Sequence, residues 1–211
     1  MIMDTQKISF SINDVSEELF HVYKNSKYLA IDTEAMGLCH GRDRLCLVQI
    51  CNELNLTTCI KIEKDCNSAN RIKNLLEDEK IMKIFHFARF DIAALKCNLS
   101  IDTRNIFCTK IASKLARTYT NKHGLKDLIY ELLNVDLDKS SQSSDWGSDD
   151  NLSTDQINYA ANDVRHLIAA MQKLTQILIR EDRYELAIRC FSVIPIHSEL
   201  DIKNFRGIFD H

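Results

Sequence analysis

Apolar and polar positions divide the chain into strands first and helices later. KISFSI (7–12) alternates as a strand does, and NDVSEELFHVYKNS follows with helical spacing. Three further β-rich runs, KYLAIDTE, RLCLVQIC and LTTCIKIE, are separated by polar turn residues. Because the connections between these three strands are short, we expect them to pair largely antiparallel.

The pattern changes after residue 66. Helical spacing occurs in SANRIKNLLEDEK and FDIAALKCNL, and the apolar segments IMKIFHF and NIFCTK read as short strands. From there to Arg189 the chain is helical apart from the polar loop KSSQSSDWGSDDN. This order predicts an α/β fold, a mixed β-sheet flanked by helices. We expect one domain over 1–194 and a tail of unassigned role over 195–211.

Composition limits the function classes without selecting one. Of the 211 residues, 45% are hydrophobic and 27% are charged, and both fractions are ordinary for a soluble domain. No apolar run approaches the ~20 residues of a membrane span, and the N-terminus lacks the long apolar segment of a signal peptide. We therefore expect a cytoplasmic protein with no membrane partner. The net charge of -3 does not indicate nucleic-acid binding, so such binding would depend on local charged patches.

The eight cysteines form no C-x-x-C pair, and several lie in apolar stretches such as RLCLVQIC. Buried thiols in a reducing compartment explain this distribution better than disulfides or a zinc site.

Two acids end the second predicted strand. Asp32 and Glu34 are two residues apart, so their side chains face the same way, with Cα atoms about 6.6 Å apart. Like charges this close raise each other's pKa unless a cation lies between them. A lone D-x-E more often marks a strand that runs out into solvent, so the pair needs support from elsewhere in the chain.

Two later segments supply further acids. In IFHFARFDIAAL, Asp91 follows a buried strand and opens a helix, where the helix dipole alone would favour an acid. In LSTDQINYAANDVRHLIAAM, Ser153 and Gln156 form a predicted capping box. Tyr159 and Asp163 then share one helical face, and a surface Tyr–Asp contact is the alternative interpretation.

Four carboxylates on three elements, with one tyrosine, predict a cation site if they converge. Hard oxygen ligands of this kind suit Mg²⁺ or Mn²⁺. Two such ions roughly 3.5–4 Å apart clamp the attacking and leaving oxygens of a phosphoryl transfer.

The three motifs, in this order and spacing, resemble the DEDD superfamily of 3′→5′ exonucleases, and within it the tyrosine subclass typified by ribonuclease D. The matching residues are Asp32-Thr33-Glu34, HFARFD ending at Asp91, and YAAND with Tyr159 and Asp163. The resemblance covers about residues 27–173. It implies a ribonuclease H-like fold and the metal-dependent release of nucleoside 5′-monophosphates from a single-stranded 3′ end of RNA.

The resemblance also implies a role for each site residue. Asp32 would bridge two divalent cations, Mg²⁺ or Mn²⁺. Glu34 and Asp163 would complete the ion on the side of the nucleophile, and Asp91 would hold the other ion largely through water. Tyr159 would orient the attacking water, since a phenol with a pKa near 10 hydrogen-bonds better than it acts as a base.

Further residues match positions that contact substrate in the family. Leu38 matches an apolar wedge beside the terminal base, with a plain core or turn leucine as the alternative. His86 matches a family histidine, and a satisfied strand histidine is the simpler interpretation. KSSQSSDWG resembles the Q-x-S-D-W loop, which would contact the 3′ nucleotide or shape the cleft through Gln142, Ser144 and Trp146; a buried Trp that anchors the loop is the alternative.

A basic stripe is predicted on the following helix. Lys110, Lys114 and Arg117 fall at i, i+4 and i+7, and Lys122, His123 and Lys126 follow. Such a stripe would contact phosphates, because backbone charge dominates nucleic-acid affinity. A solvated helix face is the commoner explanation of such a run.

The chain departs from longer ribonuclease D proteins, which append helical nucleic-acid-binding domains. We therefore expect a weaker grip on a short single strand rather than on structured transfer RNA precursors. DNA is the alternative polymer, because the contacts that distinguish the 2′-hydroxyl are not evident in the sequence. A catalytically inactive nucleic-acid-binding module is the alternative of a different class, although all four acids and the tyrosine are present.

Overall fold

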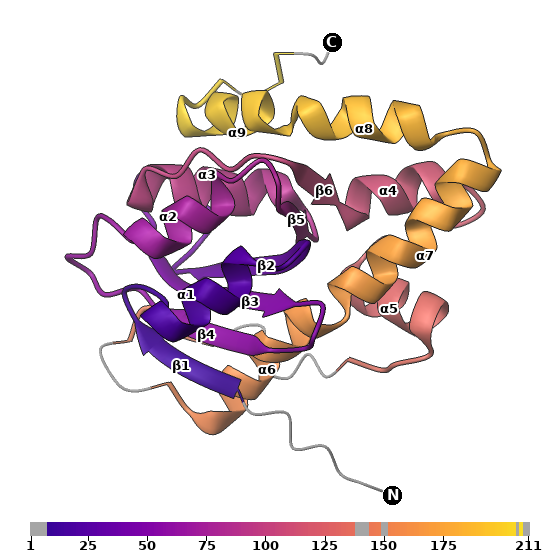
Figure 1. Ribbon diagram of the computed structural model, residues 1–211. Coiled ribbons are helices and arrows are strands. Elements are labelled where there is room, and N and C mark those ends of the chain that lie inside the picture. The colour runs from indigo at the N-terminus through magenta and orange to yellow at the C-terminus, as the bar shows by residue number, and fades with distance from the viewer. Residues whose placement is uncertain (1–7, 138–143, 149–151, 206, 209–211) are drawn as a thin grey trace, which may run out of the picture.

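A computed structural model of the protein describes residues 8–137, 144–148, 152–205, 207 and 208 (Figure 1). One six-stranded mixed sheet forms its centre, with the strand order β1-β4-β3-β2-β5-β6. The strands are β1 Ile8–Ile12, β2 Tyr28–Ala35, β3 Leu45–Asn52, β4 Thr57–Lys61, β5 Met82–Phe85 and β6 Ile106–Cys108. The α/β prediction with a mixed sheet is confirmed.

The pairing of β2, β3 and β4 follows from their short connections. β3 pairs antiparallel with both β2 and β4, as the sequence predicts. The outer strands differ, because β1 pairs parallel with β4, and β2, β5 and β6 pair parallel in turn. β2 therefore lies inside the sheet, and its acids end an interior strand rather than an edge strand.

Helices cover both faces of the sheet (Figure 1). They are α1 Glu17–Lys24, α2 Asn70–Leu76, α3 Ala88–Leu99, α4 Thr109–Ala116, α5 Leu125–Leu133, α6 Thr154–Arg165, α7 Leu167–Arg180, α8 Tyr184–Ser192 and α9 Ile194–Ile202. α6 packs against β2, β3 and β4, and α3 packs against β2, β3, β5 and β6. The elements that carry the predicted site residues therefore meet around β2.

The segment predicted as a tail begins with a helix. Pro195 stands in the first turn of α9, where its missing N–H costs nothing. α9 packs along α3. Arg89 on α3 donates two hydrogen bonds to Asp201, at 2.5 and 2.7 Å, and Ser198 Oγ donates to the Arg89 carbonyl at 2.8 Å. The sequence pattern missed this helix because both of its anchors lie more than one hundred residues away along the chain.

Two further predictions concern the chain as a whole. All eight cysteines are free thiols, so the structure forms no disulfide among them, as the sequence predicts. In the described ranges, no helix combines the length and apolar character that crossing a bilayer requires.

Candidate active site

Asp32 and Glu34 lie on one face of β2. Their register partners on β3 are Gln49 and Leu47, and the ladder is interrupted by an irregularity between Glu34 and Ala35. Both acids are half-buried. The strand alternation therefore delivers two carboxylates to the same place at the end of an interior strand.

α6 brings the other half of the site to that face. The predicted capping box is present: the Ser153 hydroxyl accepts from the Gln156 N–H at 3.2 Å, and Gln156 Oε1 accepts from the Ser153 N–H at 2.9 Å. Asp163 lies one turn after Tyr159. One carboxylate oxygen from each of Asp32, Glu34 and Asp163 lies within 4.8 Å of the other two. The structure thus brings three of the four predicted acids within reach of one cation.

Asp91 occupies a separate position in the first turn of α3. Its side chain is buried, and it accepts a hydrogen bond from Thr33 Oγ1 at 2.7 Å. Its charge is the largest electrostatic influence on Asp32 after burial itself. Asp91 therefore adjoins the three-acid cluster without belonging to it. We refer to Asp32, Glu34, Asp91 and Asp163 together as the carboxylate site.

Burial and mutual repulsion make the charged form of the carboxylate site costly. Burial, followed by the charges of Asp163 and Asp91, raises the pKa of Glu34 to about 8. Burial also raises the pKa of Asp91 to about 7, although the Thr33 hydrogen bond opposes it. The pKa of Asp32 is raised well above its usual range by burial and then by the neighbouring carboxylates.

In the parts of the chain that the structure describes, Asp32, Glu34 and Asp91 form no ion pair. Clustered hard oxygen donors without a basic partner fit a divalent cation such as Mg²⁺ or Mn²⁺.

Tyr159 lies beside the acids and is buried. Burial, followed by the charge of Asp163 and a hydrogen bond to it, raises the pKa of the phenol above its usual value. The ring centroid of Trp146 lies 6.3 Å from that of Tyr159. Tyr159 therefore stays neutral at ordinary pH and can offer a hydrogen bond, but not act as a base.

A cavity of about 520 Å³ opens over these residues. Its walls include the acids Asp32, Glu34 and Asp163 together with Tyr159. Five of the predicted substrate-binding residues also line it: Leu38, His86, Lys110, Ser144 and Trp146. Lining residues that the sequence pattern missed include Met36, Phe90, Gly124 and Leu125. Phe90 could have been found from its place directly before Asp91.

Individual predictions for the cavity wall fare differently. Leu38 is 81% exposed, which excludes the alternative of a core leucine. His86 Nδ1 shares a hydrogen bond of 2.9 Å with Thr109 Oγ1, as expected of a satisfied histidine, while the residue also faces the cavity. Trp146 is buried, which is the arrangement expected of a loop anchor. Gln142 lies outside the described residues.

The loop that carries Trp146 is held close to β2. Arg44 Nη2 donates to the Gly147 carbonyl at 3.2 Å, and Arg44 Nη1 donates to the Ile62 carbonyl at 3.0 Å. A Cβ on Gly147 would lie 2.7 Å from Met36 Cγ. The glycine therefore permits the close approach of this loop to the cavity wall.

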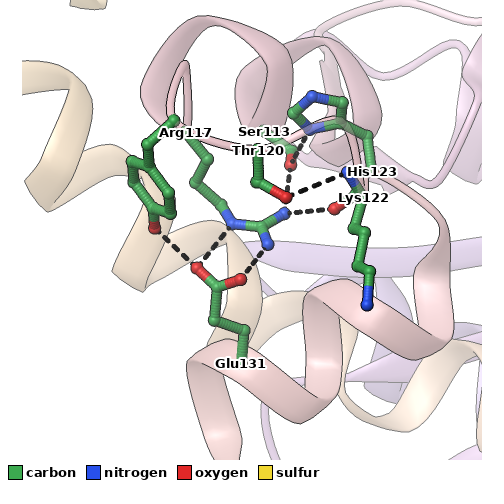
Figure 2. Close-up of polar contacts among 7 residues, drawn as sticks. Ser113, Arg117, Thr120, Lys122, His123 and Glu131 are labelled. Atoms are coloured by element: carbon green, nitrogen blue, oxygen red, sulfur yellow. Dashed lines mark hydrogen bonds and ion pairs between the residues drawn. The ribbon is translucent and has the colours of Figure 1, made fainter.

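The predicted basic stripe is wrong at Arg117. Its side chain has no exposed surface, and Nε donates to Glu131 Oε1 at 2.9 Å. Nη1 donates to Ser113 Oγ and to the Lys122 carbonyl, each at 2.8 Å, and Nη2 pairs with Glu131 Oε2 (Figure 2). A guanidinium enclosed in this way is not available to a phosphate.

The neighbours of Arg117 complete a structural cluster. His123 Nδ1 is joined to Ser113 Oγ at 2.9 Å (Figure 2). Tyr119 donates to Glu131 at 2.5 Å. Among the residues described, His123 does not line the 520 Å³ cavity, although Gly124 and Leu125 do. Lys114 lines a smaller cavity beside it. We call Arg117, Ser113, Tyr119, Lys122, His123 and Glu131 the Arg117 cluster.

Comparison with known proteins gives one family and several relatives. A 3′–5′ exonuclease family matches residues 8–179. Ribonuclease D of Gluconacetobacter diazotrophicus is 30% identical over 77% of this chain and 40% of its own length. DNA polymerase I of Aquifex aeolicus is 35% identical over 77% of this chain and 27% of its own length. The chain therefore spans less than half the length of these curated relatives.

Solved structures of Brucella melitensis NrnC match almost the whole chain. The structure bound to pGG is 42% identical, covers 98% of this chain and 100% of its own, and has a TM-score of 0.92. A second structure of that protein holds bound Mg²⁺, with a TM-score of 0.91 and 42% identity over 97% of this chain and 99% of its own.

Proposed function

The chain belongs to the 3′–5′ exonuclease family, and from that premise we propose that it removes nucleoside 5′-monophosphates from the 3′ end of short single-stranded RNA. The observation that carries this proposal is the convergence of Asp32, Glu34 and Asp163 within 4.8 Å beside an open cavity. Such a cluster is suited to phosphodiester hydrolysis because divalent cations stabilise developing negative charge on phosphate oxygens.

The carboxylate site would hold the cations. Asp32, Glu34 and Asp163 would supply oxygen donors to one ion, and Asp91 would support a second ion. When bound, these ions would neutralise the acids and polarise the phosphodiester. That the site takes two ions, and Mg²⁺ or Mn²⁺ in particular, is part of the proposal; the Mg²⁺-bound NrnC structure supports the choice of ion class.

The remaining residues of the cavity position the substrate. Tyr159, as a neutral phenol, would hydrogen-bond the water that attacks phosphorus and fix its approach. Leu38, exposed on the rim, would lie beside the terminal base, and Lys110 would face a phosphate. Ser144 and His86 add polar groups to the same wall.

We propose RNA, and not DNA, as the polymer because of what the relatives are. Ribonuclease D proteins recur among them, and NrnC has been solved with pGG. DNA is the second candidate, because DNA polymerase I of Aquifex aeolicus is also a relative. The cytoplasmic location remains a prediction from the sequence.

Matched RNA and DNA oligomers test the proposal. The protein, freed of metal and then supplied with Mg²⁺ or Mn²⁺, should shorten 5′-labelled RNA one nucleotide at a time and should cleave pGG to GMP. The chelated protein should be inactive. Faster degradation of DNA would select the second candidate, and inactivity on both polymers with either ion would contradict the proposal.

A further inference from the structure

One residue at the start of the helix that carries Asp91 has a strained backbone conformation. In the described residues, eight non-glycine residues have a positive φ, and seven of them are Asn, Asp or Ser: Asn13, Asn55, Ser100, Asn105, Asn134, Asp182 and Asn204. Phe87 is the eighth, with φ 78° and ψ 44°. Asn and Asp tolerate this left-handed conformation, whereas a bulky aromatic residue is an outlier there.

The turn at Phe87 accounts for its left-handed backbone conformation, but it does not account for an aromatic side chain there. Phe87 joins β5 to α3, and it is the residue at the N-terminal boundary of the helix that carries Asp91. A glycine or asparagine would make the same turn with less strain. Phe87 is 47% exposed, so burial of the ring does not fully offset the strain. Strain held at such a position is typical of functional sites.

A cation lies over the exposed ring. Lys110 Nζ is 4.5 Å from the centroid of the Phe87 ring. Lys110 also lines the 520 Å³ cavity of the carboxylate site, and both residues line a neighbouring cavity of about 320 Å³. The pair therefore stands on the boundary between the two cavities.

A third cavity extends the same surface. It has a volume of about 410 Å³, and Leu38 and Phe90 line both it and the carboxylate-site cavity. Phe87 lines this third cavity as well as the 320 Å³ cavity. Phe87 thus lines both of the cavities that share wall residues with the carboxylate-site cavity.

An exposed aromatic ring beside a lysine has the chemistry of a nucleotide subsite. Bases stack on aromatic side chains with little sequence preference, and cations track the phosphates of a single strand. We propose that Phe87 and Lys110 form the subsite of the penultimate nucleotide: the base stacks on the Phe87 ring, and Lys110 faces the adjoining phosphate. This proposal rests on the proposed function, because that function places the terminal nucleotide at the carboxylate site.

Phe87 is tested with variants that separate the ring from the turn. Phe87→Asn keeps a residue that accepts positive φ but removes the ring. We expect the KM for pGG to rise about tenfold with kcat changed less than twofold, because stacking contributes to binding. Inhibition by GMP, which occupies only the terminal site, should not change. The melting temperature should stay equal or rise, because the backbone strain is relieved.

Conservative and distant variants provide the controls. Phe87→Tyr keeps a stacking ring and should retain the KM of the native protein. Phe87→Leu should raise KM, whereas Phe10→Leu, the same change at a 44% exposed phenylalanine on β1, should not. Lys110→Gln should raise KM and reduce the dependence of KM on salt.

Two results would overturn the subsite. One is a native KM for pGG in Phe87→Asn. The other is a lower melting temperature together with a lower kcat and weaker GMP inhibition, which would mean that the ring supports α3.

Binding of a labelled RNA oligomer under chelation separates this proposal from the proposed function. Phe87-dependent binding without cleavage in Mg²⁺ or Mn²⁺ would contradict the nuclease and retain the subsite. Cleavage that does not depend on Phe87 would support the nuclease and contradict the subsite. A native protein that neither binds nor cleaves would overturn both.

Discussion

The carboxylate site and the Arg117 cluster are two groups of charged side chains with opposite surroundings: three acids of the first line the 520 Å³ cavity, whereas no member of the second does. Every nitrogen of the Arg117 guanidinium has a partner, and the pairing lowers the pKa of Glu131 and raises that of Arg117. At the carboxylate site the shifts run the other way: the pKa of each of Asp32, Glu34 and Asp91 is raised.

The difference lies in where the compensating charge comes from. The chain supplies it to Arg117 from a glutamate, a hydroxyl and a carbonyl, and so fixes the turn that carries Gly124 and Leu125 into the cavity wall. It supplies no ion pair to Asp32, Glu34 or Asp91 among the described residues. A charge that is paired within the chain stabilises the fold. Buried acids that have no such pairing favour the binding of a cation.

The largest expected effect is the loss of activity at the carboxylate site. Asp163→Asn and Asp32→Asn keep the shape of the side chain but remove a charged cation ligand. We expect each to lower the rate on RNA by about 10³-fold, or about 4 kcal/mol. The melting temperature without divalent ions should be equal or higher, because fewer like charges repel.

Asp155→Asn, an exposed acid in the first turn of the same helix, is the matched control and should behave as the native protein. A tenth of the native rate retained in Asp163→Asn would place the cation elsewhere.

The Arg117 cluster should show the opposite profile. Glu131→Ala leaves a buried guanidinium without its counter-charge, so we expect the free energy of unfolding to fall by about 3 kcal/mol. The melting temperature should fall by about 6–12 °C, measured by calorimetry. Activity at low temperature should change far less than in Asp163→Asn.

Glu181→Ala, which removes an exposed ion pair with Arg180, is the control and should cost about 0–1 kcal/mol. Arg117→Met should cost less than Glu131→Ala, because the glutamate that remains is partly exposed and can be hydrated. The reverse order would contradict the assignment of an internally compensated charge.

The stability of the metal-free protein should depend on pH. The folded pKa values of Glu34, about 8, and Asp91, about 7, lie above the unfolded values near 4. The folded state therefore binds more protons between about pH 4 and pH 8, and the free energy of unfolding falls as pH rises through that window. We therefore expect a lower melting temperature at pH 8 than at pH 5 in chelator.

Saturating Mg²⁺ should abolish most of this decrease in melting temperature at pH 8, because the cation takes the place of the protons. A metal-free protein whose melting temperature rises from pH 5 to pH 8 would mean that the acids are already compensated.

The smallest effect concerns Tyr159. Tyr159→Phe removes one hydrogen bond from a neutral phenol, so we expect kcat to fall about tenfold with KM little changed. Tyr130→Phe, at a residue that is 58% exposed, should be neutral. An effect confined to KM would contradict a role in orienting the water.

Local patterns in the sequence predict much of this architecture. The alternation of KYLAIDTE fixes the side of β2 on which Asp32 and Glu34 emerge, and the capping box fixes the start of α6, so the first and third motifs lead directly to the cluster of Asp32, Glu34 and Asp163. Their convergence follows from these elements because α6 packs on β2.

The features that the sequence did not predict depend on contacts distant along the chain. The spacing of Arg117 is that of an exposed stripe, and only its contact with Glu131 shows that it is enclosed. The parallel pairing of β1 with β4 and the anchoring of α9 through Asp201 are likewise non-local. Phe87 gives no local signal, because an aromatic residue is not expected at positive φ.

Diffraction from crystals soaked in Mn²⁺ tests most directly whether the carboxylate site is built for a divalent cation. We predict an anomalous peak about 2.1 Å from oxygen atoms of Asp32, Glu34 and Asp163, a distance typical of small divalent ions. A saturated soak that leaves this position without a peak, or that places the ion away from these three carboxylates, would contradict it.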